Sequence, residues 1–425
     1  MRSVRSLPAM KITGARVYDP VNSINGAVKD IFTNGSRIAA RDTGNGKIID
    51  ASGCVAMAGA IDVHSHLLGI SQLARLTGKK GLQRYASPQK LSKEYLAQGI
   101  TFFVEAGLTR DQLMETASGD EKPDIEYAAL QLACIKPGRD KADKDFLTFK
   151  YVGDTAVKNF LLSLNVKTSE PPPHVHLPHL AKGEGFFTLN KFLEKLGEKK
   201  CHLSHVSHYA IENSGGKLRS AAKKAAILLN MYKNVTLDLA PIAFGQATSF
   251  TVDEELLHRI TRSGGGEPVS HPESPYAAAE YAFKKNRYLD SILWITGMEF
   301  FLYIEDLSRA SLSMDFPSGG GIGSYPSVIA CLMDKNKRDA VLNSLDPEAV
   351  AVSSLGSLER EYTLYDVATV TRASPAYACG FKDRGHLGEG AVADMVIYDV
   401  RDDIEKMFRV PRHVIKDGEM VYPVT

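Results

Sequence analysis

Two histidines separated by one residue follow an apolar run near the start of the chain. His64 and His66 come at the end of residues 55–63, which we expect to form a buried strand. Side chains on a strand alternate between its two faces, so histidines at positions i and i+2 point the same way and can reach one metal ion. A single pair of this kind arises often by chance, so its meaning depends on the residues that come later.

Three later segments carry matching chemistry, each where a predicted strand ends. They contribute His174 and His176 after a run of prolines, His205 within a histidine-rich segment, and Asp315 before a glycine-rich loop. Histidine and carboxylate ligands without thiolate suit a zinc-type ion that keeps one position open for water. The series therefore predicts a hydrolytic metal site.

The size and composition of the chain indicate a globular protein with a large core. It has 425 residues, of which 44% are hydrophobic and 24% charged, and one large domain with a smaller one fits this length. The formal net charge is +1 and the charged residues are interspersed, which gives no reason to expect nucleic acid or an anionic membrane as a partner. No run approaches the roughly 20 apolar residues that a membrane-spanning helix needs.

The cysteines favour a cytoplasmic location. Five cysteines are dispersed without Cys-x-x-Cys spacing, which is typical of reduced thiols rather than of a disulfide framework or an iron–sulfur site. The first ten residues are basic but lack the apolar segment of a secretory signal. We therefore expect a cytoplasmic protein.

The two ends of the chain are rich in strand patterns. Residues 11–53 have the pattern of short strands joined by turns, and residues 388–421 repeat it, with a hairpin turn at Asp417 and Gly418. We therefore predict a small β-sandwich domain that is assembled from residues 1–53 and 381–425.

The middle of the chain, residues 54–380, alternates short apolar runs with amphipathic segments. The predicted strands include residues 61–67, 101–105, 146–152, 235–239 and 312–314. The predicted helices include residues 87–98, 154–164, 189–196, 217–230, 277–283 and 346–350. This alternation predicts an α/β fold, a metal-dependent (β/α)₈ barrel with insertions, in which the C-terminal ends of the strands meet at one mouth.

The order of the candidate ligands resembles that of the amidohydrolase superfamily. Within it the likeness is narrower, to the A subunit of formylmethanofuran dehydrogenase and its counterpart in the formyltransferase/hydrolase complex of methylotrophs. Residues 205–207 carry the wider likeness, and the segments that carry the narrower one are residues 17–22, 25–26, 61–66, 174–176, 235–238, 297–306, 315–320, 325–326, 360–366, 371–376 and 385–388. They extend over nearly the whole chain.

This resemblance implies a zinc amidohydrolase that interconverts N-formylmethanofuran with formate and methanofuran. It also implies partner subunits in a larger complex, in which archaeal members condense formate onto methanofuran and methylotroph members hydrolyse the formamide. The metal ligands it implies are His64, His66, His176, His205 and Asp315. The usual pattern of the superfamily selects His176 rather than His174, and Asp315 would act as general base and then general acid. His202 and His208, which flank His205, we expect at the surface or behind the ligands.

A lysine completes the set that the resemblance implies. Members with two metals usually bridge them with a carboxylated lysine at the end of the fourth strand, but that motif is not recognisable here. The region between His66 and His174 is also shorter than the number of βα units would require. Lys150 lies within a convincing predicted strand and is our candidate, so we expect two zinc ions, or one if this bridge is absent.

Two other functions fit part of the pattern. A cyclic amidohydrolase similar to dihydroorotase or hydantoinase, or another N-acyl hydrolase, would use the same ligands, although the segments 297–306 and 315–320 argue against it. A catalytically degenerate scaffold subunit would explain the short region before His174. The surviving series of histidines argues against the scaffold, and zinc content separates the two classes.

Overall fold

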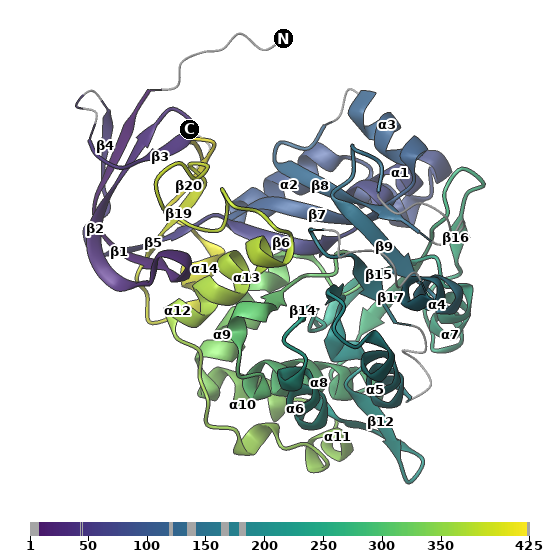
Figure 1. Cartoon of the computed structure of the whole chain (residues 1–425). Helices are drawn as coiled ribbons and strands as arrows, with labels where there is room; N and C mark the ends of the chain where they lie inside the picture. Colours follow the sequence, from purple (N-terminus) through teal and green to yellow (C-terminus); the bar gives the residue numbers. More distant parts are fainter. Residues whose placement is uncertain are drawn as a thin grey trace.

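Eight parallel strands form the wall of a nearly closed barrel in the computed structural model, which describes residues 8–42, 44, 46–118, 122–133, 142–162, 170–177 and 184–422 (Figure 1). In chain order these strands are β6 (Ala60–Ser65), β7 (Ile100–Leu108), β8 (Glu126–Leu132), β9 (Thr148–Val152), β10 (His174–His176), β11 (Cys201–Leu203), β14 (Val235–Leu239) and β18 (Ala310–Leu312). Each strand pairs with the next along this series, and a bridge between Ser65 and Phe316 joins the first edge to the last. This arrangement confirms the predicted (β/α)₈ fold class.

Helices follow the strands and cover the outside of the barrel. They are α1 (Leu67–Thr77), α2 (Pro88–Ala97), α3 (Arg110–Ser118), α4 (Asp154–Leu162), α5 (Gly185–Leu196), α6 (Ala222–Met231) and α8 (Tyr288–Tyr303). Helix α2 begins where its sequence indicates, because the Ser87 side chain accepts a hydrogen bond from the Lys90 amide and Pro88 occupies the first turn. Further helices complete this body: α9 (Tyr325–Met333), α10 (Lys335–Leu342), α11 (Pro347–Ala351), α12 (Leu364–Ala368) and α13 (Ser374–Ala378).

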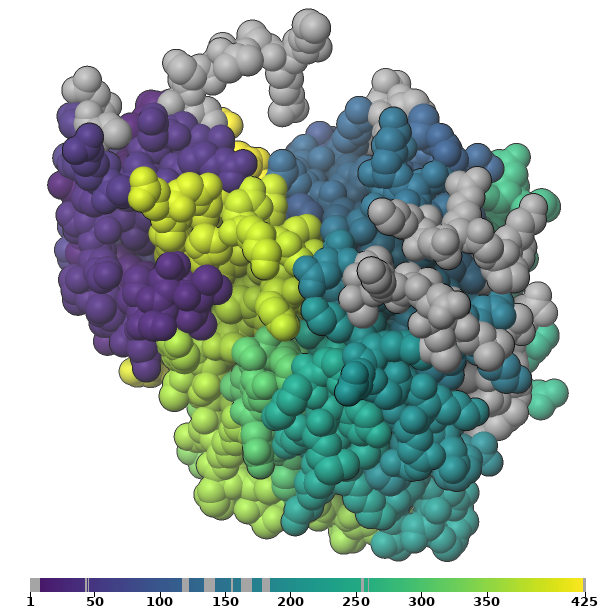
Figure 2. Space-filling model, viewed as in Figure 1, coloured from purple at the N-terminus to yellow at the C-terminus, as the bar shows by residue number. Residues whose placement is uncertain are grey.

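Both ends of the chain contribute to a second sheet. Its strands are β1 (Met10–Asp19), β2 (Ile24–Asn34), β3 (Arg37–Ala39), β4 (Lys47–Asp50), β5 (Cys54–Ala58), β19 (Met395–Asp399), β20 (His413–Lys416) and β21 (Glu419–Tyr422). The two halves meet where β5 pairs antiparallel with β19. Figure 2 shows the purple N-terminal and yellow C-terminal residues gathered on one side of the molecule. The turn between β20 and β21 has positive φ at Asp417 and Gly418, as a tight hairpin requires.

The junction between this sheet and the barrel lies near the predicted domain boundary. Strand β5 belongs to the terminal sheet, and Gly59 separates it from β6 of the barrel. The buried Arg372 side chain joins the two parts, because it donates hydrogen bonds to the Ala58 carbonyl and the Tyr398 hydroxyl. The exact domain limits, 1–53 with 381–425 and 54–380, stay predictions.

An insertion after β14 departs from the expected secondary structure. It consists of β15 (Gly245–Thr251), α7 (Glu254–Arg262), β16 (Val269–Ser270) and β17 (Ala277–Phe283). The predicted helix over residues 277–283 is wrong, because this alanine-rich segment pairs antiparallel with β15 along its whole length. Pairing with a neighbouring strand has outweighed local helix propensity here.

A second prediction is wrong in part. Residues 217–230 do not form one helix, because Lys217–Ser220 pairs as β13 with β12 (Ile211–Ser214), and α6 starts only at Ala222. The remaining predicted helices correspond to α2, α4, α5 and α11.

Two main apolar cores accompany the two sheets. The larger lies among the barrel strands and their helices, and the smaller is confined to the terminal sheet. Four cysteines, Cys54, Cys201, Cys331 and Cys379, are buried free thiols, whereas Cys134 lies outside the described residues. Among the described residues, none of the helices has the length and apolar character required to cross a bilayer.

Candidate metal centre

The six side chains predicted to bind metal lie at one end of the barrel. Five of them lie near the C-terminal ends of the first, fifth, sixth and eighth strands or just beyond them, and the sixth lies in the middle of the short fourth strand. They are His64 on β6, His66 after it, Lys150 on β9, His176 on β10, His205 after β11 and Asp315 after β18. Parallel strands present their C-terminal ends at the same mouth, which is why residues so distant in sequence meet here.

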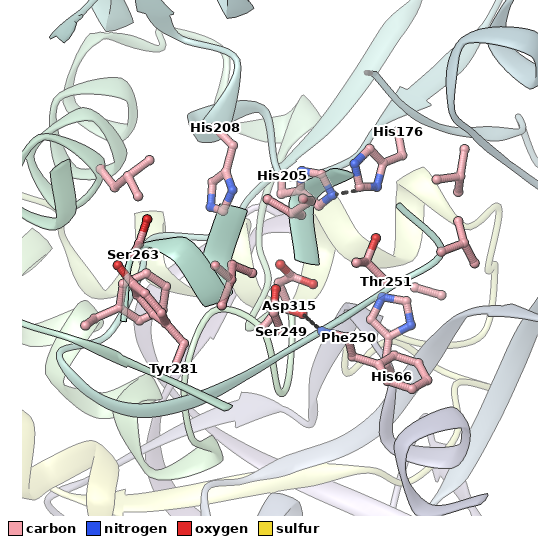
Figure 3. A pocket seen from close by; sticks show the side chains of 18 of the residues that line it. His66, His176, His205, His208, Ser249, Phe250, Thr251, Ser263, Tyr281 and Asp315 are labelled. Atoms are coloured by element: carbon pink, nitrogen blue, oxygen red, sulfur yellow. Dashed lines mark hydrogen bonds between the residues drawn. The ribbon is translucent and has the colours of Figure 1, made fainter. Parts of the chain in front are cut away.

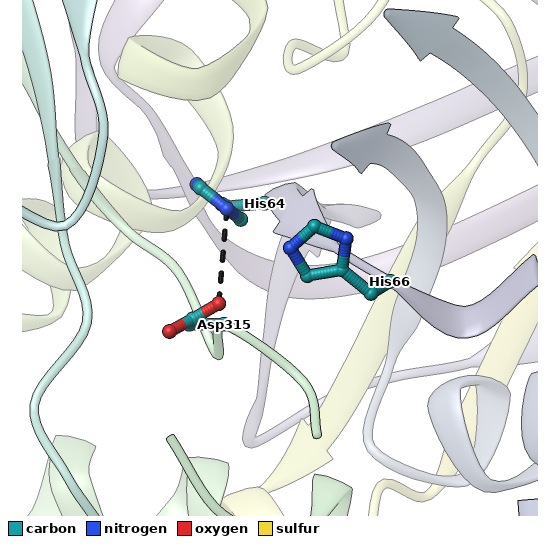
Figure 4. Close-up of side chains that lie close together, drawn as sticks. All are labelled: His64, His66 and Asp315. Atoms are coloured by element: carbon teal, nitrogen blue, oxygen red, sulfur yellow. Dashed lines mark ion pairs between the residues drawn. The ribbon is translucent and has the colours of Figure 1, made fainter. Parts of the chain in front are cut away.

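Three of these side chains form the tightest group. One ligand atom each from His64, His66 and Asp315 lies within 4.8 Å of the other two, and all three residues are buried (Figure 4). The His64 Nε2 atom is 3.7 Å from Asp315 Oδ1. This spacing leaves room for one cation between two imidazoles and a carboxylate.

The other three side chains adjoin this group. Lys150 Nζ is 3.3 Å from His64 Nε2, and His205 Nε2 is 3.2 Å from His176 Nδ1. The ring centroids of His64 and His205 are 5.0 Å apart. The structure therefore brings all six predicted residues together.

The histidines have the protonation that a cation requires. Burial lowers the pKa of His64 to about 4 and holds the pKa values of His66, His176 and His205 well below the usual range. The rings are therefore neutral near pH 7 and offer lone pairs. The Nδ1 atoms of His66 and His205 are buried and have no hydrogen-bond partner among the described residues. Such orphaned nitrogens fit a bound metal ion.

Lys150 lies on the fourth barrel strand, where the superfamily carries its bridging lysine. Its side chain is buried, and Nζ is 2.7 Å from the Ser204 hydroxyl. Burial lowers the pKa of Lys150 to about 8, so a much larger fraction of the amine is neutral near pH 7 than in an exposed lysine. Only a neutral amine reacts with CO₂ to form a carbamate, so this environment is suited to carboxylation.

Two of the predicted ligands have a strained backbone. His205 has φ of 37° and Asp315 has φ of 44°, which place both in the left-handed region that non-glycine residues rarely adopt. Each such residue costs roughly 1 kcal/mol or more and persists where the surroundings enforce it. At His205 the backbone amide donates a hydrogen bond of 2.9 Å to Asp238 Oδ1. Strain at both positions is consistent with a functional site.

Asp238 is a site residue to which we assigned no role from the sequence. This buried carboxylate on β14 lies 3.4 Å from His64 Nδ1 and 3.1 Å from His202 Nε2. Burial alone would raise the pKa of Asp238, but His64 and His202 hold it well below the usual range. A carboxylate behind a histidine orients the ring toward the metal. An acid within an otherwise apolar strand, Val-Thr-Leu-Asp-Leu, was the signal that could have revealed it.

His202 and His174 occupy the barrel interior. His202 was expected at the surface or behind the ligands, and it is fully buried, with Nδ1 3.0 Å from the Thr236 hydroxyl. The ring of His174 lies 4.3 Å from that of His202, and neither of its nitrogens has a hydrogen-bond partner among the described residues. His176 lines the cavity described next and His174 does not, which agrees with the choice of His176 as the candidate ligand.

A cavity of about 380 Å³ extends from the predicted metal ligands between the walls of the insertion (Figure 3). His66, Lys150, His176, His205 and Asp315 line its inner end. Its apolar walls come largely from the insertion and α8, including Phe250, Leu256, Ile260, Tyr276 and Leu293. The volume exceeds the needs of a formyl group alone and suits a larger organic substrate.

Comparisons with known proteins agree with this architecture. The family described as "Amidohydrolase family" matches residues 233–422. Protein FwdA of Methanocaldococcus jannaschii is 28% identical, over 95% of this chain and 86% of the relative. The A subunit of the formyltransferase/hydrolase complex Fhc of Methylorubrum extorquens is 27% identical, over 97% of this chain and 88% of the relative.

Solved structures show the same fold. The formyltransferase/hydrolase complex FhcABCD from Methylorubrum extorquens, determined with methylofuran, matches with a TM-score of 0.84, 24% identity, and coverage of 97% of this chain and 88% of that chain. The N-acyl-D-glutamate deacylase from Bordetella bronchiseptica, determined with zinc and a phosphonate inhibitor, matches with a TM-score of 0.60, 16% identity, and coverage of 99% and 97%.

Fold and comparisons point to one class: residues 233–422 match the amidohydrolase family, and the whole chain has the fold of the FhcABCD and N-acyl-D-glutamate deacylase structures. Within that class its similarity to FwdA and to the Fhc A subunit extends over nearly its full length, which confirms the narrower resemblance predicted from the sequence.

Proposed function

We propose that the protein is a zinc-dependent amidohydrolase that interconverts N-formylmethanofuran with formate and methanofuran. The observation that carries this proposal is the convergence of His64, His66 and Asp315, with Lys150, His176 and His205 beside them, at the inner end of one cavity. The likeness to FwdA and the Fhc A subunit supplies the substrate class.

The proposed ligand set suits two zinc ions. The compact group of His64, His66 and Asp315 would hold one ion, and His176 and His205 would hold the other. Lys150, as a carbamate, would supply a carboxylate between them, with one ion expected if it does not carboxylate. When bound, zinc would polarise the formamide carbonyl and lower the pKa of a water molecule.

Asp315 would transfer the proton that the reaction moves. Burial, and then the neighbouring Asp238, raise the pKa of Asp315 well above the usual range, which favours a carboxylate that accepts and returns a proton. It would take a proton from the attacking water and deliver it to the amide nitrogen as the C–N bond breaks. The products are formate and a primary amine, and the same groups serve the reverse condensation.

Lys150 would be modified before it acts. Its neutral amine would form an N–C bond with CO₂ and release one proton to solvent, which leaves a carbamate in place of a cation. Ser204, whose hydroxyl is 2.7 Å from Nζ, would hold that side chain in position.

Partner subunits are part of the proposal. The Fhc A subunit belongs to a formyltransferase/hydrolase complex, and the solved FhcABCD structure contains methylofuran. By this likeness we propose that the present chain works with other subunits of such a complex on a methanofuran-type substrate. Neither nucleic acid nor a membrane is among the proposed partners, and the cytoplasmic location that the cysteines favour belongs to the same proposal.

Metal analysis and a substrate panel test this function together. The purified protein should contain about two zinc ions per chain and release formate from N-formylmethanofuran faster than from other N-formyl amines. Dihydroorotate and N-acyl amino acids serve as competing substrates, and preference for either would favour the alternative amidohydrolase. Carefully purified protein without zinc, and without turnover after zinc is supplied, would leave only the scaffold function.

A further inference from the structure

His208 lies in the cavity between its metal-binding end and its outer walls. Figure 3 shows its ring pointing into the cavity beside His205, on the side away from His176. The ring centroids of His205 and His208 are 5.4 Å apart, and both residues line the cavity. Unlike His66, His176 and His205, His208 has no proposed metal role.

The hydrogen bond of His208 defines which nitrogen carries its proton. Its Nε2 atom is 3.2 Å from the carbonyl oxygen of Ala240, and a carbonyl can only accept a hydrogen bond, so Nε2 donates. A neutral imidazole carries one N–H, so a ring that donates from Nε2 has its lone pair on Nδ1. Nδ1 therefore carries a lone pair that is open to a donor from the cavity.

A secondary formamide presents two polar groups, a carbonyl and an N–H, to this end of the cavity. Its carbonyl must face the metal-binding residues, and its nitrogen must lie near Asp315 to receive a proton. The N–H group then needs a hydrogen-bond acceptor on the cavity wall next to the predicted metal ligands. Asp290, an acid further along the same cavity, already accepts hydrogen bonds from Tyr281 and the Lys284 amide. His208 offers an acceptor beside the metal-binding residues.

We infer that Nδ1 of His208 accepts a hydrogen bond from the formamide N–H and so positions the substrate. This inference rests on the proposed function and adds a rule of specificity to it. Secondary formamides satisfy both partners, whereas tertiary formamides lack the N–H group and leave the His208 acceptor unpaired. A polar group that the bound substrate covers and leaves unpaired is costly, so the site should discriminate between these two classes.

His208 could instead serve only to hold its loop, and two substitutions separate the roles. The side-chain nitrogen of His208→Gln approximates Nε2, so it can keep the bond to the Ala240 carbonyl while losing the acceptor at Nδ1. The side-chain oxygen of His208→Asn approximates Nδ1, so it keeps an acceptor but loses that bond. The Ala240 carbonyl also accepts from the Ser207 hydroxyl at 3.3 Å, so the loop retains one tie in either variant.

The experiment compares N-formylmethanofuran with its N-methyl derivative, as substrate or as competitive inhibitor. We expect H208Q to lower kcat/KM for the secondary formamide about tenfold or more, and to change the constant for the tertiary formamide less than about threefold. H208N should keep the discrimination of the parent protein. His258→Gln, on the exposed face of α7, is the matched control and should change neither constant.

Each outcome decides the matter. Equal losses for both formamides in H208Q would overturn the role of His208 while leaving the proposed function intact. Loss of discrimination in H208N with retention in H208Q would assign His208 to the loop alone. If the unmodified, zinc-loaded protein turns over no formamide, the proposed function fails and this inference fails with it.

Discussion

The two ends of the cavity are built in different ways. At the inner end, each proposed metal ligand lies on a barrel strand or shortly after one, so hydrogen bonding between neighbouring strands determines its position. At the outer end, much of the wall comes from the sheet and helix inserted after β14. The barrel strands therefore position the proposed metal ligands. The insertion, which the barrel fold does not require, forms much of the wall of the proposed substrate cavity.

The two ends are nevertheless joined through the loop that carries Asp315. The Thr248 amide of β15 donates a hydrogen bond of 3.1 Å to the Pro317 carbonyl. The Phe250 amide donates one of 3.2 Å to the Ser318 hydroxyl. Because the two ends are built differently, substitutions at the inner end should alter turnover, and substitutions in the insertion should alter substrate binding. An effect of the insertion on turnover would show that these hydrogen bonds couple the two ends.

Loss of Asp315 should have the largest effect. We expect Asp315→Asn to fold normally and to lower kcat by about three orders of magnitude or more, because it removes both the proton acceptor and a proposed ligand. Steady-state kinetics and zinc content measure this, with Asp402→Asn at an exposed position as the control. Near-normal turnover in D315N would remove Asp315 from the mechanism.

Removal of the Lys150 side chain should come next. We expect Lys150→Ala to lower kcat about a hundredfold and to lose zinc more readily, because the proposed carbamate can no longer form. Short carboxylic acids added to K150A should restore part of the activity by occupying the vacated space. Native mass spectrometry of the unmodified protein should show the mass of one added CO₂, and an unmodified lysine in an active protein would contradict the bridge.

A substitution in the insertion should change binding instead of turnover. Leu256 on α7 lines the cavity, and Leu256→Ala should raise KM about tenfold with kcat nearly unchanged, because apolar contact is lost equally before and during reaction. Ile227→Ala on α6, where the side chain is 58% exposed, is the control. A large fall in kcat for L256A would show that the insertion acts on Asp315 through the shared loop.

The smallest effect is expected where the insertion contacts the barrel. The Tyr276 hydroxyl donates a hydrogen bond of 2.8 Å to the Gly107 carbonyl of β7. Tyr276→Phe should lower the free energy of unfolding by about 1 kcal/mol and leave KM within twofold. Denaturant unfolding measures this against Tyr377→Phe, whose side chain is 62% exposed. A KM change comparable to that of L256A would mean that this contact also shapes the cavity.

The same contrast explains what could be read from the sequence. His64 and His66 were predictable because a strand repeats every two residues and because a polar pair ends an apolar run. Lys150 was chosen on other grounds, because the family resemblance implies a lysine on the fourth strand and because a convincing apolar strand surrounds this one. Distant residues converge because the barrel topology is regular, so recognising the alternation of strand and helix was enough to place them together.

The insertion could not be predicted in this way. Residues 277–283 contain three consecutive alanines, and their strand conformation depends on pairing with β15, which lies more than twenty residues earlier. The direction of the His208 ring depends on a carbonyl contributed by another segment, at Ala240. The pattern of residues within one segment does not indicate its contacts with distant segments.

The left-handed backbone at His205 and Asp315 has a consequence for engineering. Glycine adopts that conformation without steric penalty, so either residue replaced by glycine would relieve roughly 1 kcal/mol of backbone strain while deleting a side chain that the proposed reaction needs. At these two positions, a substitution that raises thermal stability is therefore expected to lower the proposed activity. By the proposed roles, a library selected for thermal stability alone would be enriched in stable but inactive variants at these positions.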